Sequence, residues 1–85
     1  MISAATQTER SALLHDAVIA ALRSSGYRLL GNLECEVRED LVILTGVLPS
    51  FYLKQVAQMI AMGVDQVREV RNVVEVDADW LDKRR

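Results

Sequence analysis

Residues 41–48, with the sequence LVILTGVL, form an almost continuous apolar run that only Thr45 and Gly46 interrupt. Because successive residues of a strand point to opposite faces of a sheet, such a run needs apolar cover on both sides. Strands of this kind lie in the interior of a sheet rather than at its edge. The run is also far shorter than the ~20 apolar residues that a membrane-spanning helix needs. It therefore predicts a central strand around which the rest of the chain folds.

The residues before this run predict its neighbour in the sheet. In residues 33–38 apolar and charged side chains alternate: Leu33, Cys35 and Val37 fall on one face, and Glu34, Glu36 and Arg38 on the other. The polar pair Glu39-Asp40 is short enough for a tight turn, so the two runs read as a β-hairpin. Outward charges on alternate positions are typical of an edge strand, because they discourage pairing with another chain.

Two helices and a third strand complete the pattern. Residues 8–25 show helical periodicity, and Gly26 suits a left-handed C-terminal cap. A second helix is expected over residues 51–62, with Ser50 as its N-cap and Gly63 at its end. Residues 67–77 alternate again, as a strand does. The expected core positions of the two helices are Leu14, Ala17, Val18, Ala21, Leu22, Leu53, Val56, Ala57, Ile60, Ala61 and Val64.

The resulting order is α-β-β-α-β, which predicts an α+β sandwich with both helices on one face of a three-stranded sheet. A right-handed crossover would set the third strand parallel to the second, giving a mixed sheet in the order 1-2-3. A wholly antiparallel sheet in the order 2-1-3 is the alternative, and the two-faced apolar run favours the former. The 85 residues fit a single domain, with a core over about 16–77 and a tail at 78–85.

Composition excludes several classes of protein. About half of the residues are apolar and the net charge is −2, which excludes a disordered chain and wholesale neutralisation of nucleic-acid phosphates. One cysteine and one histidine exclude a disulfide framework and most zinc sites. We expect no cofactor. The opening residues lack an export signal, which predicts a cytoplasmic chain as given, or a periplasmic one if a signal has been removed.

The ordered combination of strands and helix resembles the BON domain, named for bacterial osmotically induced and nodulation proteins. That pattern is roughly V-x-L-x-G-x-V, a helix with spaced alanines, and then G-V-x-x-V-x-N-x-L-x-V. The matching residues are Val42, Leu44, Gly46, Leu48, Ala57, Ala61, Val67, Val70, Asn72, Val74 and Val76. The stretch 16–22 is similar to the family's first helix. Gln66 stands where the family usually has glycine, so we expect Gly63 to take the turning role.

The resemblance implies a non-catalytic binding module. BON domains are associated with phospholipid surfaces and envelope assemblies, and some occur in cytoplasmic proteins beside a LysM domain. With no room for a companion domain in 85 residues, the chain looks like a stand-alone BON domain. The family match also indicates that Asn72 has a structural role, satisfying backbone groups near a bulge or sheet end, rather than a ligand contact.

The residues whose side chains could take part in catalysis or ligand binding have simpler structural explanations. His15 has no paired serine or cysteine, which favours a solvated surface histidine over a proton-transfer group. Cys35 falls on the apolar side of its strand and is expected to be buried. Glu34 and Glu36 share a face but fit a solvated edge better than a carboxylate pair. The loop from Gly26 to Gly31 lacks the ending of a phosphate loop. No residue set therefore predicts an enzyme.

The second helix carries the strongest sign of a binding surface. Lys54 is the one charged residue between positions 51 and 64, and Phe51, Met59 and Met62 fall opposite the core face with Gln55 and Gln58. Exposed apolar groups of this kind indicate an interface, unless the helix is rotated or the Trp80 tail covers it. Phe51, Gln55, Met59 and Met62 are thus the candidate interface.

A second candidate interface is Ile43, Val47 and Val73, on the sheet face that the helices leave open. The predicted function is binding of a protein partner, including a second copy of the chain. The alternatives are a phospholipid surface, although the chain lacks the basic surplus for anionic lipid, and a small ligand or ion.

Overall fold

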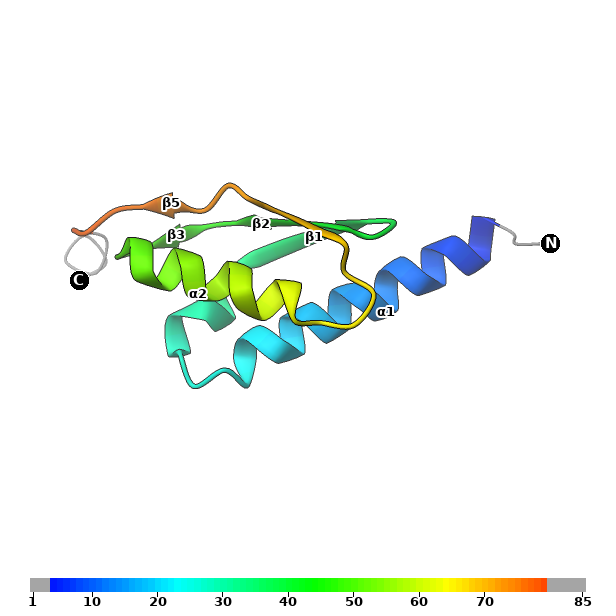
Figure 1. The fold of residues 1–85 in the computed structure, drawn as a ribbon, viewed down its shortest axis with the longest axis horizontal. Coiled ribbons are helices and arrows are strands. Elements are labelled where there is room, and N and C mark those ends of the chain that lie inside the picture. Colours follow the sequence, from blue (N-terminus) through cyan, green and yellow to red (C-terminus); the bar gives the residue numbers. More distant parts are fainter. Residues whose placement is uncertain (1–3, 80–85) are drawn as a thin grey trace.

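The computed structural model describes residues 4–79, and its chain folds into a sheet with two helices on one side (Figure 1). The helices are α1 (Ala4–Arg23) and α2 (Phe51–Met62), with a short 3-10 helix, η1 (Arg28–Asn32), after α1. The strands are β1 (Glu34–Arg38), β2 (Leu41–Thr45), β3 (Val47–Leu48), β4 (Glu69–Asn72) and β5 (Glu75–Val76). The predicted tail beyond residue 79, with Trp80, lies outside the described residues.

The sheet has the predicted central strand. Its order is β1-β2-β4, with β1 antiparallel and β4 parallel to β2. The hairpin turn is the two-residue pair Glu39-Asp40, since Arg38 pairs directly with Leu41. The mixed sheet in the order 1-2-3 is therefore confirmed, and the wholly antiparallel alternative is wrong. The central place of β2 agrees with its burial, because Val42 and Leu44 are completely buried and strands pair along both of its edges.

Gly46 interrupts the predicted second strand. Its φ of +134° takes the backbone out of strand geometry, so β2 ends at Thr45 and β3 resumes at Val47. The predicted third strand is divided in the same way into β4 and β5. The parallel register continues unchanged across the break, as Leu41 pairs with Glu69 and Val47 with Glu75, and the Glu75 N–H donates to the Gly46 carbonyl at 2.9 Å.

Both helices pack beneath the same face of the sheet (Figure 1), as predicted. The buried core draws on every layer: Leu14, Val18, Leu22, Leu30, Leu33, Val42, Leu44, Leu48, Ala57, Ala61 and Val74. Two differences from the sequence prediction stand out. Ala17 is exposed, because α1 contacts the sheet along a narrower stripe than its periodicity indicated. Leu30 of η1 is fully buried, in a segment that the sequence indicated only as the loop from Gly26 to Gly31.

The helix ends follow their capping residues. α1 ends at Arg23, two residues earlier than predicted, and Gly26 adopts the expected left-handed conformation with a φ of +88°. α2 has the predicted bounds, and the Ser50 hydroxyl accepts a hydrogen bond from the Leu53 N–H at 3.2 Å. This bond satisfies one of the free N–H groups in the first turn.

The turn before β4 corrects one prediction. Gly63 has an ordinary helical φ of −78°, so it does not take the turning role. Gln66 itself adopts the left-handed conformation, with a φ of +76°. The departure from the family pattern thus leaves the backbone path in place and puts a side chain where glycine is sterically easier. Within residues 4–79 neither helix has the length and apolar content that crossing a bilayer requires.

Candidate functional site

The outward face of α2 carries exposed apolar side chains, as its sequence predicted. Phe51 is 75% exposed, Met59 66% and Met62 46%. On the opposite face Ala57 and Ala61 are completely buried against the core. The predicted rotation of the helix is therefore confirmed, and the exposed methionines do not belong to the core.

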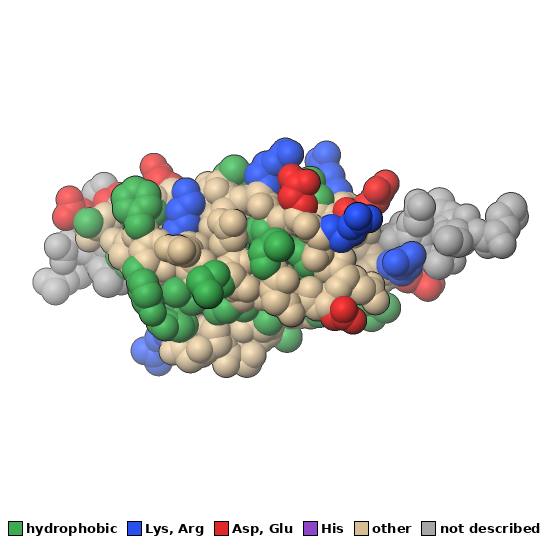
Figure 2. Space-filling model, viewed as in Figure 1, with side chains coloured by type: hydrophobic (Ala, Val, Ile, Leu, Met, Phe, Trp, Pro, Cys, Tyr) green, Lys and Arg blue, Asp and Glu red, His purple; other side chains and the backbone are tan. Residues whose placement is uncertain are grey.

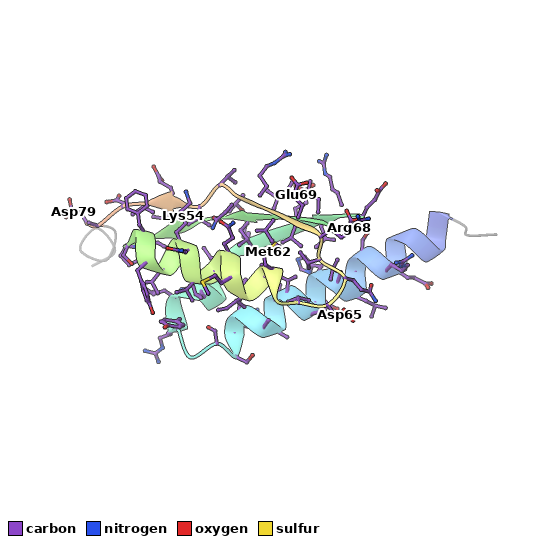
Figure 3. The ribbon with its side chains drawn as sticks, viewed as in Figure 1. Lys54, Met62, Asp65, Arg68, Glu69 and Asp79 are labelled. Atoms are coloured by element: carbon purple, nitrogen blue, oxygen red, sulfur yellow. The ribbon has the colours of Figure 1, made fainter. Side chains whose placement is uncertain are left out.

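These side chains border one continuous shallow depression. We define the α2 surface as the residues that line it: Phe51, Lys54, Gln55, Gln58, Met59, Met62 and Gly63. Figure 2 shows hydrophobic side chains gathered over α2 on the visible face, and Figure 3 shows Lys54 and Met62 projecting from the same helix. Lys54 is the one charged residue of this surface. Three of the predicted interface residues, Phe51, Met59 and Met62, lie on it together with the fourth, Gln55.

The rotation of α2 is fixed by packing and by one side chain of the sheet. Ala57 and Ala61 have no bulk beyond Cβ, so the helix approaches the core closely at these positions. The Asn72 Nδ2 donates a hydrogen bond to the Lys54 carbonyl at 2.8 Å, and its Oδ1 accepts from the Val74 N–H at 3.2 Å. Asn72 thus satisfies backbone groups on two elements. Its structural role is confirmed, and the α2 surface is held facing outward.

A tyrosine pair next to the α2 surface was not predicted. The hydroxyls of Tyr27 and Tyr52 are 3.0 Å apart, and the rings meet edge to face with centroids 6.2 Å apart. The hydrogen bond with Tyr52 raises the pKa of Tyr27. The pair ties the loop after α1 to the first turn of α2. The two tyrosines are 25 positions apart in the sequence, and no local pattern would indicate this contact.

The open face of the sheet is less exposed than the α2 surface. Ile43 and Val47 are half-buried, whereas Val73 is 53% exposed. Ile43 is flanked in register by Glu36 on one side and Arg71 on the other. The Arg38 Nε contacts the Glu36 Oε1 at 2.9 Å, so charged groups border the apolar centre as predicted. Cross-strand packing covers part of this second candidate interface without a partner.

The residues whose side chains could take part in catalysis or metal binding do not lie together in the structure. The His15 Nδ1 lies 3.5 Å from the Asp16 Oδ1 on an exposed part of α1. Cys35 was expected to be buried but is only half-buried. Its partial burial raises the pKa of the thiol, which disfavours the reactive thiolate. Among the described residues there is no group of three or more histidine, cysteine or acidic side chains that could hold a metal ion.

A second depression lies between α1, the hairpin turn and the turn before β4. Its lining residues are Arg10, Ser11, Leu14, Glu39, Asp40 and Gln66. Glu39 and Gln66 are the two non-glycine residues with positive φ in the described chain, and both border it. The Asp40 carbonyl accepts from the Arg68 N–H at 3.0 Å, and the Arg68 Nε lies 3.6 Å from the Asp40 Oδ2. These contacts join the hairpin to the start of β4 and account for the local backbone.

The two helices and the mixed sheet define a small α+β domain. The sequence profile of the BON domain family matches residues 11–78, so the chain belongs to the BON domain family. Members of this family are binding modules. The match extends five residues further toward the N-terminus than the core expected from the sequence, and ends one residue later. A search of curated proteins gave no match to the chain.

Proposed function

We propose that this domain binds a protein partner through the α2 surface and catalyses nothing. The observation that carries the proposal is the composition of the α2 surface. It exposes Phe51, Met59 and Met62. Among its lining residues there is one lysine and no acidic side chain. Isolated surface helices normally carry charged residues on the outward face. An exposed apolar patch with a polar border is typical of an interaction site.

The side chains of the α2 surface are suited to a macromolecular partner. Methionine is unbranched and has a polarizable sulfur, so it adapts to irregular apolar surfaces. Gln55 and Gln58 add donors and acceptors that are satisfied by water in the free domain and by a partner in a complex. The depression is open and shallow, which fits a protein surface better than an enclosed small molecule.

Phospholipid binding is the second candidate, because BON domains are associated with membrane surfaces. The α2 surface offers only Lys54 for attraction to anionic headgroups, and the chain as a whole carries a net charge of −2. Attraction to such lipids grows by about 1 kcal/mol for each basic residue near the membrane. The charge pattern therefore favours the protein partner. For an ion, no depression on the described residues brings together three or more histidine, cysteine or acidic side chains.

Site-specific photo-crosslinking in the producing cells tests the proposal. A photoreactive amino acid at Gln58 should crosslink to a protein, whereas the same group at Leu13, which is 70% exposed on α1, should not. The variant Met59→Glu/Met62→Glu should lose the crosslink, because each buried carboxylate would lack a partner. The matched control Leu13→Glu/Ala20→Glu adds the same charge at exposed apolar positions of α1 and should keep it.

Flotation with vesicles of phosphatidylcholine and phosphatidylglycerol separates the membrane alternative. The proposal expects the domain to stay with the soluble fraction. Flotation that disappears in Met59→Glu/Met62→Glu and weakens as salt rises would instead assign the α2 surface to lipid. A Gln58 crosslink that survives the double glutamate substitution would contradict the proposed site itself.

A further inference from the structure

The order of side chains along α2 identifies a particular partner. We propose that the α2 surface pairs with the α2 surface of a second copy of this chain, with the two helices antiparallel across a two-fold axis. This inference rests on the proposed function and names its partner.

The spacing of the exposed residues defines a straight line along the helix. Phe51, Gln55, Gln58 and Met62 follow one another at intervals of four, three and four residues. Residues at such intervals share one side of a helix and form the contact line of packed helix pairs. The sequence of side-chain types along this line is apolar, amide, amide, apolar, so it is the same in both directions.

Antiparallel pairing matches this line with itself. With the two-fold axis between residues 56 and 57, Phe51 of one copy faces Met62 of the other, and Gln55 faces Gln58. Each apolar side chain then meets an apolar one. Each amide meets an amide, which offers both a donor and an acceptor to the other. A two-fold interface requires this kind of self-complementary surface.

Lys54 does not oppose antiparallel pairing. In the antiparallel register the two Lys54 residues lie on the same flank of the contact, about 7.5 Å apart along the helix axes at 1.5 Å per residue. Their apolar stems pack along the interface while both ammonium groups reach solvent. The helix macrodipoles favour the antiparallel arrangement, because it sets the positive N-terminus of each helix beside the negative C-terminus of the other.

The exposed area indicates a weak dimer. At about 200 Å² for a large free side chain, Phe51, Met59 and Met62 together expose roughly 370 Å². The two glutamines and the Lys54 stem bring this to roughly 600 Å² per copy, so the pair would bury roughly 1,200 Å². That value lies at the lower end of specific interfaces. We therefore expect dissociation in the micromolar range rather than an obligate dimer.

Two double substitutions at exposed positions test the pairing. In the antiparallel register residue 55 faces residue 58 of the other copy. Gln55→Glu/Gln58→Lys therefore sets opposite charges against each other in both contacts, whereas Gln55→Glu/Gln58→Glu sets like charges together. In a parallel register residue 55 would face residue 55, so both variants would bring like charges together. Leu13→Glu/Ala20→Glu, at two exposed positions of α1, controls for the added negative charge.

Sedimentation equilibrium of the purified chain and its variants, from about 1 µM to about 1 mM, gives the readout, with far-ultraviolet circular dichroism to confirm folding. We expect the parent, the Leu13→Glu/Ala20→Glu control and Gln55→Glu/Gln58→Lys to dimerise, and Gln55→Glu/Gln58→Glu to lose at least tenfold in affinity. Lowered affinity in both glutamine variants would overturn the antiparallel register. A monomeric parent throughout would overturn the second copy as partner. A Gln58 crosslink to another protein could still be found after either result. The crosslinking experiment therefore tests the proposed function separately from the dimer.

Discussion

The side-chain amide of Asn72 donates a hydrogen bond of 2.8 Å to the carbonyl oxygen of Lys54, which joins the end of β4 to the first turns of α2. The acceptor belongs to the one charged residue of the α2 surface, but the bond is made by its backbone. The lysine side chain takes no part in this bond and lies on the α2 surface, where Figure 3 labels it. A single asparagine thus couples the sheet to the orientation of the binding helix.

Replacing this asparagine should weaken the domain. Asn72→Ala removes both hydrogen bonds of the side chain, and we expect the free energy of unfolding to fall by about 1–3 kcal/mol. Asn72→Asp keeps an acceptor for the Val74 N–H but sets a carboxylate oxygen against the Lys54 carbonyl, so it should also destabilise. Urea denaturation measures both effects. Asn32→Ala, at an exposed position, serves as the control and should stay within about 0.5 kcal/mol of the parent. An unchanged midpoint for Asn72→Ala would show that α2 is oriented by packing alone.

Gly46 should not tolerate a side chain. A Cβ at this position would lie 2.8 Å from the Leu33 Cδ2, and the φ of +134° is unfavourable for any residue with a Cβ. Leu33 is buried and cannot move aside freely. We expect Gly46→Ala to lower the free energy of unfolding by about 1–3 kcal/mol, and Gly46→Val by more. Thermal denaturation provides the measurement.

The same chemical change at Gly31 is the matched control for Gly46. A Cβ there would meet the Arg23 Cγ at 3.5 Å, an ordinary contact, and its φ is not in the positive range that disfavours side chains. Gly31→Ala should therefore be close to neutral. Equal losses at the two glycines would mean that the break between β2 and β3 imposes no special steric demand.

Gln66 is a position where glycine should improve the protein. A left-handed backbone destabilises a residue with a Cβ by about 1–2 kcal/mol, and glycine avoids this strain. Glycine is also more flexible in the unfolded chain, which offsets roughly 0.5–1 kcal/mol of the gain. Gln66→Gly should therefore raise the free energy of unfolding by up to about 1 kcal/mol. Asp65→Gly, one residue earlier and without a positive φ, should lower it. If both glycine variants are destabilised, some contact of the Gln66 side chain outweighs its backbone strain.

Cys35 should react slowly with thiol reagents in the native protein. Half-burial raises the pKa of the thiol, so less of the nucleophilic thiolate is present at neutral pH than in the unfolded chain. The labelling rate of the folded protein should keep rising to a higher pH than that of the denatured protein. The raised pKa also means that the stability contributed by the neutral thiol is present below the unfolded pKa and is lost as pH rises through the folded pKa. Native labelling as fast as denatured labelling would place Cys35 at the surface.

The local patterns of the sequence determined much of the architecture. The alternation over residues 33–38 and the two-sided apolar run over 41–48 predicted an edge strand and a central strand, because the period of two decides which side chains face the core. Ser50 marked the start of α2, because its hydroxyl can accept a hydrogen bond from an N–H group of the first turn, and Gly63 marked the end of the helical pattern. The charge-poor outward face of α2 could also be predicted from the sequence, because the helical period of 3.6 residues places Met59 and Met62 on a different side from Ala57 and Ala61.

Other features were decided only when distant segments met. The burial of Leu30, the contact of Tyr27 with Tyr52 and the hydrogen bond from Asn72 to Lys54 all join residues far apart in the chain, and no local period encodes such pairings. The left-handed conformation of Gln66 opposes its local preference, because the connection from α2 must turn there for β4 to lie parallel to β2. The sequence thus determined which faces are apolar, whereas tertiary packing decided which of them are covered and which remain open to a partner.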